Sequence, residues 1–521
     1  MRSRSPRALM IAAAFLAALE VRADVELSPL FSDHAVLQCD RVVPVWGTAD
    51  PGERVEVSFH GFSVAALTEA TGRWLVLLPA MRADSEGAEL EAAGRTRSVA
   101  RDVVLGEVWL CSGQSNMEFP VDERSQDTGV RMQVLDSDKE IAAADHPLIR
   151  QFRVSRSLSG APAETLSGRW EVCSPRTVPA FSAVGYFFAR SLQHRLGAPF
   201  GLLSSSYGGT PVESWMSAYA LGSNRTFLDI ERRWQEMAAE YPARKAAFEG
   251  ALAEWVRGSA AAAAHGNAAL LAYQRGHPRP RGPLDPSGPW RPSSLFNGMI
   301  EPLLPYALRG VLWYQGEANA DHAPEYHARF EAMIRAWRAH FGQGDLPFLY
   351  VQLANFRAPG LPPDAWARLR EAQAQTLSLP ATGMAVTIDI GEPDNIHPRN
   401  KQEVGRRLAL IARARVYGIP GDWSGPTFVG STLVGGSLRV RFEHADNGLT
   451  ARDRPVQSLE IAGADRVFHP AMGRIEGDTL LVGSQAVPHP IAIRYAWSNA
   501  PGANLYNGAG LPAAPFRSDD W

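Results

Sequence analysis

Between residues 103 and 416, apolar segments of strand length alternate with longer amphipathic segments, and this alternation limits the fold more than any other feature. Strands are predicted at residues 103–110, 199–203, 309–314, 346–353 and 384–388. Helices are predicted at residues 182–194, 324–341 and 399–416. Such alternation is typical of a parallel sheet with helices on both faces. We therefore expect a three-layer α/β domain in this part of the chain.

Small and polar residues follow four of these strands. Ser115 follows the first strand, Gly209 the second and Asn319 the third, and residues 394–397 follow the last. Ligand chemistry in open α/β sheets collects outside the carboxyl ends of the strands. We therefore expect these four positions to meet at one edge of the sheet.

Ser115 is the candidate nucleophile, and it lies where a strand gives way to a helix. Backbone N–H groups are free at such a position and favour a developing negative charge. The alternative interpretation is that Ser115 only caps the helix. Gly209 and Asn319 likewise have ordinary alternatives, as a turn residue and a helix cap.

His397 is the candidate general base, because Asp394 precedes it by three residues. A carboxylate at this spacing can bond the far ring nitrogen and hold the tautomer that accepts a proton. A surface histidine is the alternative interpretation of this short motif. Asp321 and Asp389 are rival acids, but neither has this spacing to His397.

The regions that flank the α/β part are expected to be all-β. A chain of 521 residues is too long for one core. Short alternating strands and Asp-Pro-Gly or Gly turns at residues 24–104 and 420–521 predict β-sandwich-like segments that pack against each other or complete one sandwich together. Residues 224–290 are expected to form a helical insertion that covers one edge of the site, because residues 227–256 are rich in Ala, Glu and Arg and predict two helices.

The N-terminus has the pattern of a secretory signal. Arg2, Arg4 and Arg7 precede the apolar run at residues 8–19, and Ala23 ends an A-x-A-like cleavage site. The run is short for a membrane span. We expect a signal peptide at residues 1–23, and a secreted or periplasmic protein that does not contact the membrane after cleavage.

Charge and cysteine content exclude several classes of partner. The net charge of −3 gives no indication of a nucleic-acid partner. Cys39, Cys111 and Cys173 allow at most one disulfide, and no Cys/His cluster has zinc-ligand spacing. We therefore expect no metal site.

Four segments of the sequence resemble the blocks of the SGNH hydrolase superfamily. They are Gly-Gln-Ser-Asn-Met at 113–117, Tyr-Gly-Gly-Thr at 207–210, Gln-Gly-Glu-Ala-Asn at 315–319 and Asp-Asn-Ile-His at 394–397. More narrowly, these segments resemble the sialate O-acetylesterase family, as do supporting stretches from residue 31 to residue 507. The resemblance implies a flavodoxin-like SGNH hydrolase domain in two parts, at residues 105–223 and 291–419, on either side of the insertion.

The resemblance also implies a role for each motif residue. Ser115 is the nucleophile, His397 the base and Asp394 the acid that orients it. The oxyanion donors are the backbone N–H groups of Ser115 and Gly209 and the side-chain amide of Asn319. The implied reaction removes an O-acetyl group from a carbohydrate through an acetyl-serine intermediate, without metal or cofactor.

The sugar that carries the acetyl group stays open at this point. A sialic acid and a plant hemicellulose such as xylan or xyloglucan are both compatible with an exported acetylesterase. Candidate substrate-binding residues are Gln114, Trp215, Trp313 and Glu317; the two tryptophans can stack on sugar rings or belong to the core. A non-catalytic carbohydrate-binding protein and a lipase of the same superfamily are the remaining alternatives.

Overall fold

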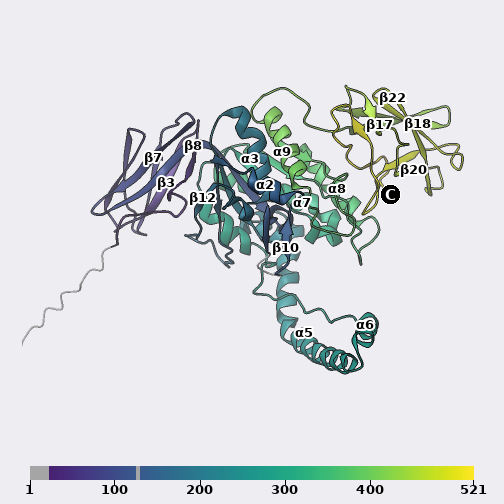
Figure 1. The fold of residues 1–521 in the computed structure, drawn as a ribbon, viewed down its shortest axis with the longest axis horizontal. Coiled ribbons are helices and arrows are strands. Elements are labelled where there is room, and N and C mark those ends of the chain that lie inside the picture. Colours follow the sequence, from purple (N-terminus) through teal and green to yellow (C-terminus); the bar gives the residue numbers. More distant parts are fainter. Residues whose placement is uncertain (1–22, 125–128) are drawn as a thin grey trace, which may run out of the picture.

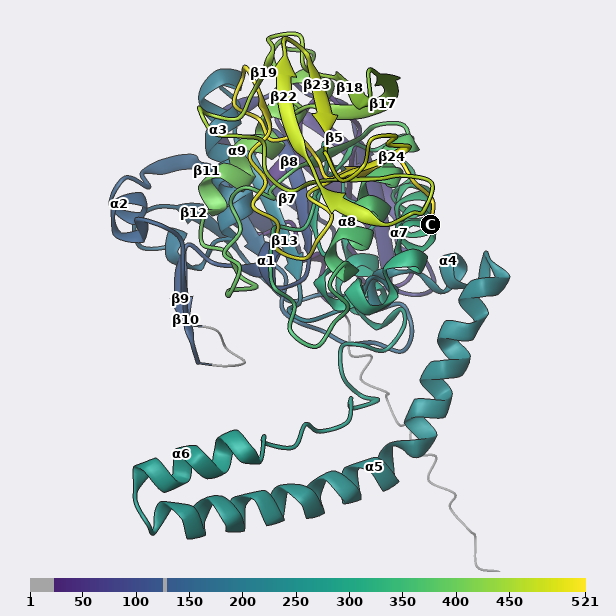
Figure 2. The ribbon, with the colours of Figure 1, turned by 90° about the vertical axis from the view of Figure 1, so that its right-hand side faces the viewer.

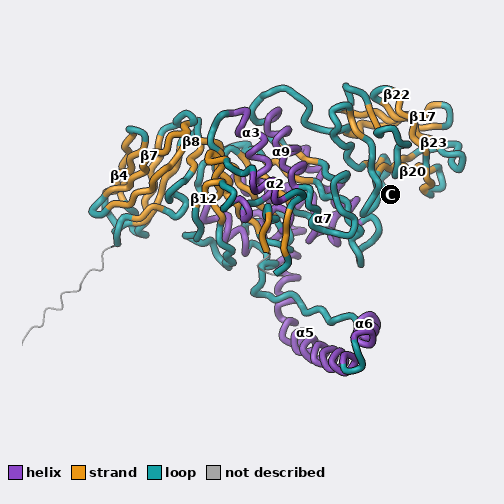
Figure 3. The backbone as a smooth tube through the Cα atoms, in the orientation of Figure 1, coloured by secondary structure: helices purple, strands orange, loops and turns teal. Residues whose placement is uncertain are grey.

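A computed structural model describes residues 23–124 and 129–521 of the chain. Three parts follow one another along the long axis, with a β region at each end and an α/β part between them (Figure 1). Strands dominate the two ends, and helices gather in the centre and in one projecting arm (Figure 3). All but the last residue of the predicted signal peptide lie outside the described residues.

The central sheet has the strand order β12-β11-β13-β8-β14-β15-β16. Its strands are β8 (Arg97–Gly113), β11 (His146–Arg153), β12 (Trp170–Cys173), β13 (Phe200–Ser206), β14 (Gly310–Tyr314), β15 (Phe348–Val351) and β16 (Thr382–Ala385). Only β12 is antiparallel to its neighbour in this sheet. Without β11 and β12, the remaining five strands have the flavodoxin-like order 2-1-3-4-5.

Helices cover both faces of this sheet. Cys111 of β8 contacts α3 (Ala183–Leu196), which packs against α9 (Lys401–Arg415). Trp313 of β14 pairs with Ser112, the next residue of β8, and packs against Trp337 of α7 (Ala323–Phe341). Successive residues of a strand point to opposite faces. Therefore α7, with its neighbour α8 (Ala365–Gln375), lies on the face opposite α3 and α9.

The N-terminal β region is joined to the central sheet by one continuous strand. The first half of β8 pairs with β7 (Asp84–Ala93), and its second half pairs with β13 and β14. The predicted boundary between residues 104 and 105 therefore falls inside a strand. The other strands of this region are β1 (Glu26–Leu27), β2 (Val36–Gln38), β3 (Val43–Thr48), β4 (Arg54–Phe59), β5 (Phe62–Leu67) and β6 (Arg73–Leu78).

The C-terminal β region contains two four-stranded sheets and a short pair. One sheet has the order β17-β18-β23-β22, the other β21-β20-β24-β26, and β19 pairs with β25. The strands are β17 (Thr427–Val434), β18 (Ser437–Glu443), β19 (Leu449–Thr450), β20 (Leu459–Ala462), β21 (Phe468–Pro470), β22 (Met472–Glu476), β23 (Thr479–Gly483), β24 (Ala492–Tyr495), β25 (Tyr506–Asn507) and β26 (Phe516–Arg517). That either terminal region is sandwich-like stays a prediction.

The prediction that the two β regions pack against each other is wrong. They lie at opposite ends of the molecule, with the α/β part between them (Figure 1). The C-terminal region is fixed to α8 instead: the buried Arg370 guanidinium donates to the carbonyl oxygens of Ser498 and Asn499, and Arg517 forms an ion pair with Glu371. Alternation of apolar residues shows that a β region has a buried face, but not which surface covers it.

The insertion forms an arm that projects from the α/β part (Figure 2). It contains one long helix, α5 (Arg225–Ala263), with Pro242 inside it, and α6 (Asn267–Gly276), which packs back on α5; the short helix α4 (Ala218–Gly222) directly precedes the arm. The sequence predicts two helices over the stretch that α5 spans alone. Only the first turns of α5 are buried against the body, through Phe227 and Ile230.

Among the shorter elements of the described chain, four lie near the start of the α/β part. They are α1 (Ser115–Glu118), α2 (Ser137–Ala142), and the hairpin of β9 (Asp122–Arg124) and β10 (Arg131–Gln133). No helix among the described residues is long and apolar enough to cross a membrane.

Candidate active site

Ser115 and His397 form a hydrogen-bonded pair at the carboxyl edge of the central sheet. Ser115 begins α1 directly after the end of β8, and His397 lies in the loop between β16 and α9. The Ser115 Oγ is 2.8 Å from the His397 Nε2. The fold therefore brings Ser115 and His397, which are far apart in the sequence, into contact.

His397 is held in its neutral form. Burial, and to a smaller extent the positive charge of Lys401, lower the pKa of its imidazole to about 4. At neutral pH the ring therefore carries one proton, and Nε2 can accept the proton of the serine hydroxyl. This is the protonation state that a general base requires.

Asp394 does not contact His397 in this structure, contrary to the sequence prediction. Its carboxylate forms an ion pair with Arg357, and its side chain is 76% exposed. The side chain that bonds His397 locally is Asn395, which accepts the His397 backbone N–H at 3.0 Å and donates to its carbonyl oxygen at 2.9 Å. A spacing of three residues places the acid on the correct turn but does not fix its rotamer.

Two backbone N–H groups beside the Ser115 hydroxyl are available to an oxyanion. Among the described residues, neither the Ser115 N–H nor the Gly209 N–H has an intramolecular acceptor. Gly209 has a φ of +73°, which glycine adopts without a steric cost. The neighbouring Gly208 is so close to the nucleophile that an added Cβ would lie 3.3 Å from the Ser115 Cβ.

Asn319, the third predicted oxyanion donor, is buried and firmly held. Its Oδ1 accepts hydrogen bonds from the Val212 N–H at 2.9 Å and from the Gln315 amide at 2.7 Å. Its Nδ2 donates one hydrogen bond, to Glu213 at 2.9 Å. An amide nitrogen has two N–H groups, so one of them remains for a ligand.

Glu118 holds the loop that carries Gly209, a role that the sequence did not reveal. Its carboxylate accepts the Gly208 N–H at 3.0 Å and two hydrogen bonds from Arg156, whose guanidinium lies 4.3 Å from the centre of the Tyr207 ring. Burial raises the pKa of Glu118, and Arg156 opposes that shift. The only sequence signal was its position three residues after the nucleophile.

Behind the Ser115–His397 pair lies a buried polar network centred on Asn116. The Asn116 amide donates to the Ile396 carbonyl at 3.0 Å and to Glu317 at 2.5 Å, and its Oδ1 accepts from Lys401 at 2.6 Å. Burial raises the pKa of Glu317 and lowers that of Lys401 to about 7, while their mutual attraction opposes both shifts. Asn116, the residue after the nucleophile, is thus hydrogen-bonded to Ile396, the residue before the base.

The sequence prediction that Glu317 binds substrate is wrong in this structure. Its side chain points into the network behind the pair and does not line either of the cavities described below. The signal that could have indicated the network is Lys401, one of only three lysines in the chain.

A cavity of about 490 Å³ opens in front of the Ser115–His397 pair; we call it the serine cavity. Ser115, His397, Gly208 and Gly209 line it on one side. The rest of the lining combines apolar residues with charged side chains. The apolar residues are Pro120, Val130, Met132 and Ile396, and the charged side chains are those of Glu118, Glu123, Arg124, Arg153 and Arg156. Three arginines against two carboxylates give this lining a net positive charge.

A second cavity of about 480 Å³ lies on the other side of Gly209; we call it the tryptophan cavity. Gly209 lines both cavities, and Asn319 lines this second one. Its walls include Trp234 of α5 and Trp290, the last residue of the insertion. The insertion therefore lines this second cavity through the first turns of α5 and through Leu284 and Trp290, while its distal part projects away (Figure 2). That it covers one edge of the active site stays a prediction.

Trp215 and Trp313, the predicted stacking residues, belong to the core, which corrects their assignment as substrate-binding residues. Both have 0% exposure, and their rings pack edge to face at 5.9 Å. Gln114 does line the serine cavity, but its Oε1 accepts the backbone N–H groups of Gly316 and Ala318, each at 3.3 Å. The periodicity of apolar residues and the composition of a segment do not distinguish a tryptophan buried beneath a site from one that lines it.

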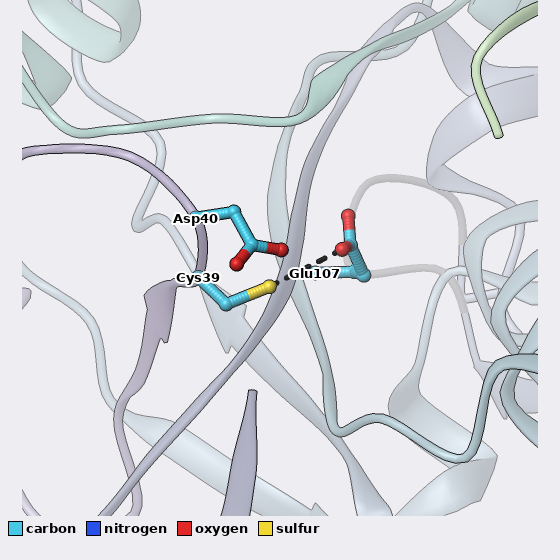
Figure 4. A group of neighbouring side chains, drawn as sticks. All are labelled: Cys39, Asp40 and Glu107. Carbon is cyan, nitrogen blue, oxygen red and sulfur yellow. Dashed lines mark hydrogen bonds between the residues drawn. The ribbon is translucent and has the colours of Figure 1, made fainter. Parts of the chain in front are cut away.

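Cys39, Asp40 and Glu107 are the one group of potential metal ligands within the described residues (Figure 4). The Cys39 thiol donates to Glu107 at 3.3 Å, and burial raises its pKa to about 12, so it is not a thiolate. Glu107 is already neutralised by Arg309, which donates two hydrogen bonds to it. This donor set does not suit a metal ion. The three cysteines are buried free thiols.

Comparisons with known proteins find relatives among the carbohydrate acetylesterases. Residues 261–413 match the model of a family described as carbohydrate esterase, sialic acid-specific acetylesterase. The chain is 29% identical to a sialate O-acetylesterase from Mus musculus, over 91% of this chain and 90% of that protein. A crystal structure of a carbohydrate acetylesterase from Xanthomonas citri aligns with 39% identity and a TM-score of 0.79, over 95% of this chain and all of the other.

Proposed function

The chain belongs to the sialate O-acetylesterase-like family of carbohydrate esterases, and we propose that it deacetylates its carbohydrate through Ser115, His397 and Asp394. As a family member it is a carboxylic-ester hydrolase. The observation that carries the proposal is the 2.8 Å contact between the Ser115 Oγ and a neutral His397 Nε2, beside two N–H groups that have no acceptor within the described part of the chain. The proposed mechanism uses no metal or cofactor.

In the first half-reaction, the Ser115 Oγ attacks the carbonyl carbon of the acetyl ester and the His397 Nε2 takes the hydroxyl proton. The negative charge that develops on the carbonyl oxygen is stabilised by the N–H groups of Ser115 and Gly209 and by the Asn319 amide. The bond to the sugar oxygen then breaks. The leaving oxygen takes the proton from Nε2, and the acetyl group remains on Ser115.

In the second half-reaction, water replaces the sugar. His397 takes a proton from this water, whose oxygen attacks the acetyl carbon, and the same donors stabilise the new oxyanion. The bond to the Ser115 Oγ breaks, Nε2 returns the proton to Oγ, and acetic acid leaves with the other proton of the water, which it then loses to solvent to become acetate. The free enzyme is restored with its atoms and charge in balance.

Asp394 completes the triad by a change of rotamer. Its bond to Arg357 is a surface ion pair, with side-chain exposures of 76% and 65%, and breaking such a pair costs about 1 kcal/mol or less. A carboxylate beside the imidazole stabilises the imidazolium that forms in both half-reactions. That gain exceeds the cost of leaving Arg357.

The lining of the serine cavity makes an anionic acetylated sugar, such as a sialic acid, the first candidate substrate. Arg153 is bound to Glu123 by a single hydrogen bond of 3.1 Å and is 38% exposed. A guanidinium in this position can donate two hydrogen bonds to a sugar carboxylate in a bidentate contact. A neutral hemicellulose is the alternative substrate, and it has no carboxylate for Arg153 to bind.

The sequence also supports export of the enzyme. Arg2, Arg4 and Arg7, the apolar run at residues 8–19 and the small residue Ala23 form a signal-peptide pattern. The mature chain would begin at Asp24. N-terminal sequencing of the protein from the periplasm or medium checks this, and recovery of the intact N-terminus from the cytoplasm alone would contradict it.

Acetate release from a panel of O-acetylated sialosides, xylans and xyloglucans tests the proposed function. We expect the wild type to release acetate and the Ser115→Ala variant to release none. The Arg153→Gln variant should lose activity on sialosides and keep it on xylans. Activity that persists in Ser115→Ala would refute the mechanism, and equal loss on both sugars would refute the role of Arg153.

A further inference from the structure

We propose that the tryptophan cavity is a second sugar subsite, which binds the neutral sugar next to the acetylated residue of a glycan chain. This inference rests on the proposed function, because it takes the serine cavity as the place of the acetylated residue. It assigns the helical insertion a role in substrate selection. The enzyme would therefore prefer acetyl groups on chain-linked sugars to those on free monosaccharides.

The position of the cavity supports this role. It adjoins the oxyanion loop, because Gly209 lines both cavities and Asn319 lines the tryptophan cavity. A chain whose acetylated residue lies at Ser115 can continue past Gly209 into the neighbouring cavity. Its volume of about 480 Å³ is within the range of about 300–1,000 Å³ that is usual for small-ligand sites.

The walls of the cavity combine aromatic and planar polar groups. The half-buried indoles of Trp234 and Trp290, with Met237, provide apolar surface. Glu213 and Arg329, which form a buried ion pair, provide carboxylate and guanidinium groups. A pyranose ring has an apolar C–H face and a rim of hydroxyl groups, and this combination of groups suits both.

The charge of the lining favours a neutral occupant. Arg233 and Arg329 are balanced by Glu213 and Asp321. The serine cavity, in contrast, has an excess of one positive charge. An acidic sugar therefore fits the serine cavity better, and a neutral neighbouring sugar fits the tryptophan cavity.

The insertion holds this wall in place. Phe227 and Ile230 are buried at the start of α5, and Arg233 lies 3.7 Å from Glu325 of α7 in an ion pair. These contacts fix the turns of α5 that carry Trp234. The Trp290 indole N–H donates to the Gly209 carbonyl oxygen at 2.9 Å, so the wall of the second cavity also supports the oxyanion loop.

The test compares chain-linked and free substrates with the Trp234→Ala variant of the full-length enzyme. One pair is O-acetylated sialyllactose and free O-acetylated sialic acid, and the other is acetylated xylotetraose and acetylated xylose. Trp255→Ala is the matched control, because Trp255 is a half-buried tryptophan on the same helix that bonds the His277 carbonyl and does not line the cavity. Thermal unfolding verifies that each variant is folded.

We expect the wild type to prefer the chain-linked member of its substrate pair by about tenfold in kcat/KM, since stacking on one aromatic ring is worth about this much. In Trp234→Ala this preference should fall about fivefold or more, through KM, and in Trp255→Ala it should not change. A wild type without the preference, or an unchanged preference in Trp234→Ala, would overturn the subsite. Absence of acetate release from every substrate would refute the proposed function instead.

Discussion

The two sides of the Ser115–His397 pair are built differently. On the sheet side, Asn116 is buried and Glu317 half-buried just after strand ends, and a short hydrogen bond links them. On the loop side, Asp394 is exposed and its partner is a surface arginine. Groups on the sheet side are therefore placed by strand register before a ligand arrives. The acid on the loop side depends on a rotamer that costs little to change.

The largest expected effect comes from replacing His397, the residue that lies between the sheet side and the loop side. Replacing His397 with Ala removes the base, and kcat should fall about 10⁴-fold or more while the fold is retained. Initial rates on 4-nitrophenyl acetate check this. His194→Ala, at an exposed position near the end of α3, is the matched control and should retain wild-type kcat. A His397→Ala variant with more than a tenth of wild-type activity would contradict the assignment of the base.

The second variant tests the loop side directly. Asp394→Asn keeps the shape of the side chain but cannot stabilise the imidazolium, so kcat should fall about 10³-fold. Arg357→Gln removes only the surface partner and should leave kcat within about threefold of the wild type. If both variants are nearly fully active, the enzyme works as a Ser-His dyad and Asp394 remains where this structure has it.

A third variant weakens the sheet side. Asn116→Ala leaves Lys401 and Glu317 buried without their shared partner, so the free energy of unfolding should fall by about 3 kcal/mol and kcat by about 100-fold. Urea denaturation and initial rates measure the two quantities.

Asn224→Ala provides the comparison for this variant. Asn224 caps α5 at an exposed position, and its loss should cost about 1 kcal/mol with no change in kcat. If Asn116→Ala changed stability as little as Asn224→Ala, the buried network would not be what holds the two sides together.

The smallest expected effect is a displacement of the pH profile. His397 must be neutral to act as base, so kcat/KM should fall as the pH drops through its pKa of about 4. At that pH Lys401 is charged and disfavours the imidazolium. Lys401→Met removes this charge, so the acidic limb should move to higher pH. Lys245→Met, at an exposed position on α5, should not move it, and a limb that stays in place in Lys401→Met would refute the coupling.

The sequence was sufficient to predict the features of the site that strand register controls. Ser115, Gly209, Asn319 and His397 meet at the carboxyl edge because parallel strands end on one side of a sheet. It was insufficient where side-chain direction decides. The rotamer of Asp394, the burial of Trp215 and Trp313 and the bonds of Glu118 depend on neighbours that no local pattern specifies. The same holds for the place of the C-terminal β region, which is fixed by Arg370.

Trapping of the acetyl group on Ser115 tests the central claim most directly. The wild type is mixed with an O-acetylated sialoside, quenched rapidly in acid and digested, and the peptide containing residues 110–120 is examined by mass spectrometry. The account predicts one acetyl group on Ser115 during turnover, and none in the Ser115→Ala variant, which also releases no acetate. Acetate release without a modified Ser115 peptide, or undiminished release by Ser115→Ala, would contradict it.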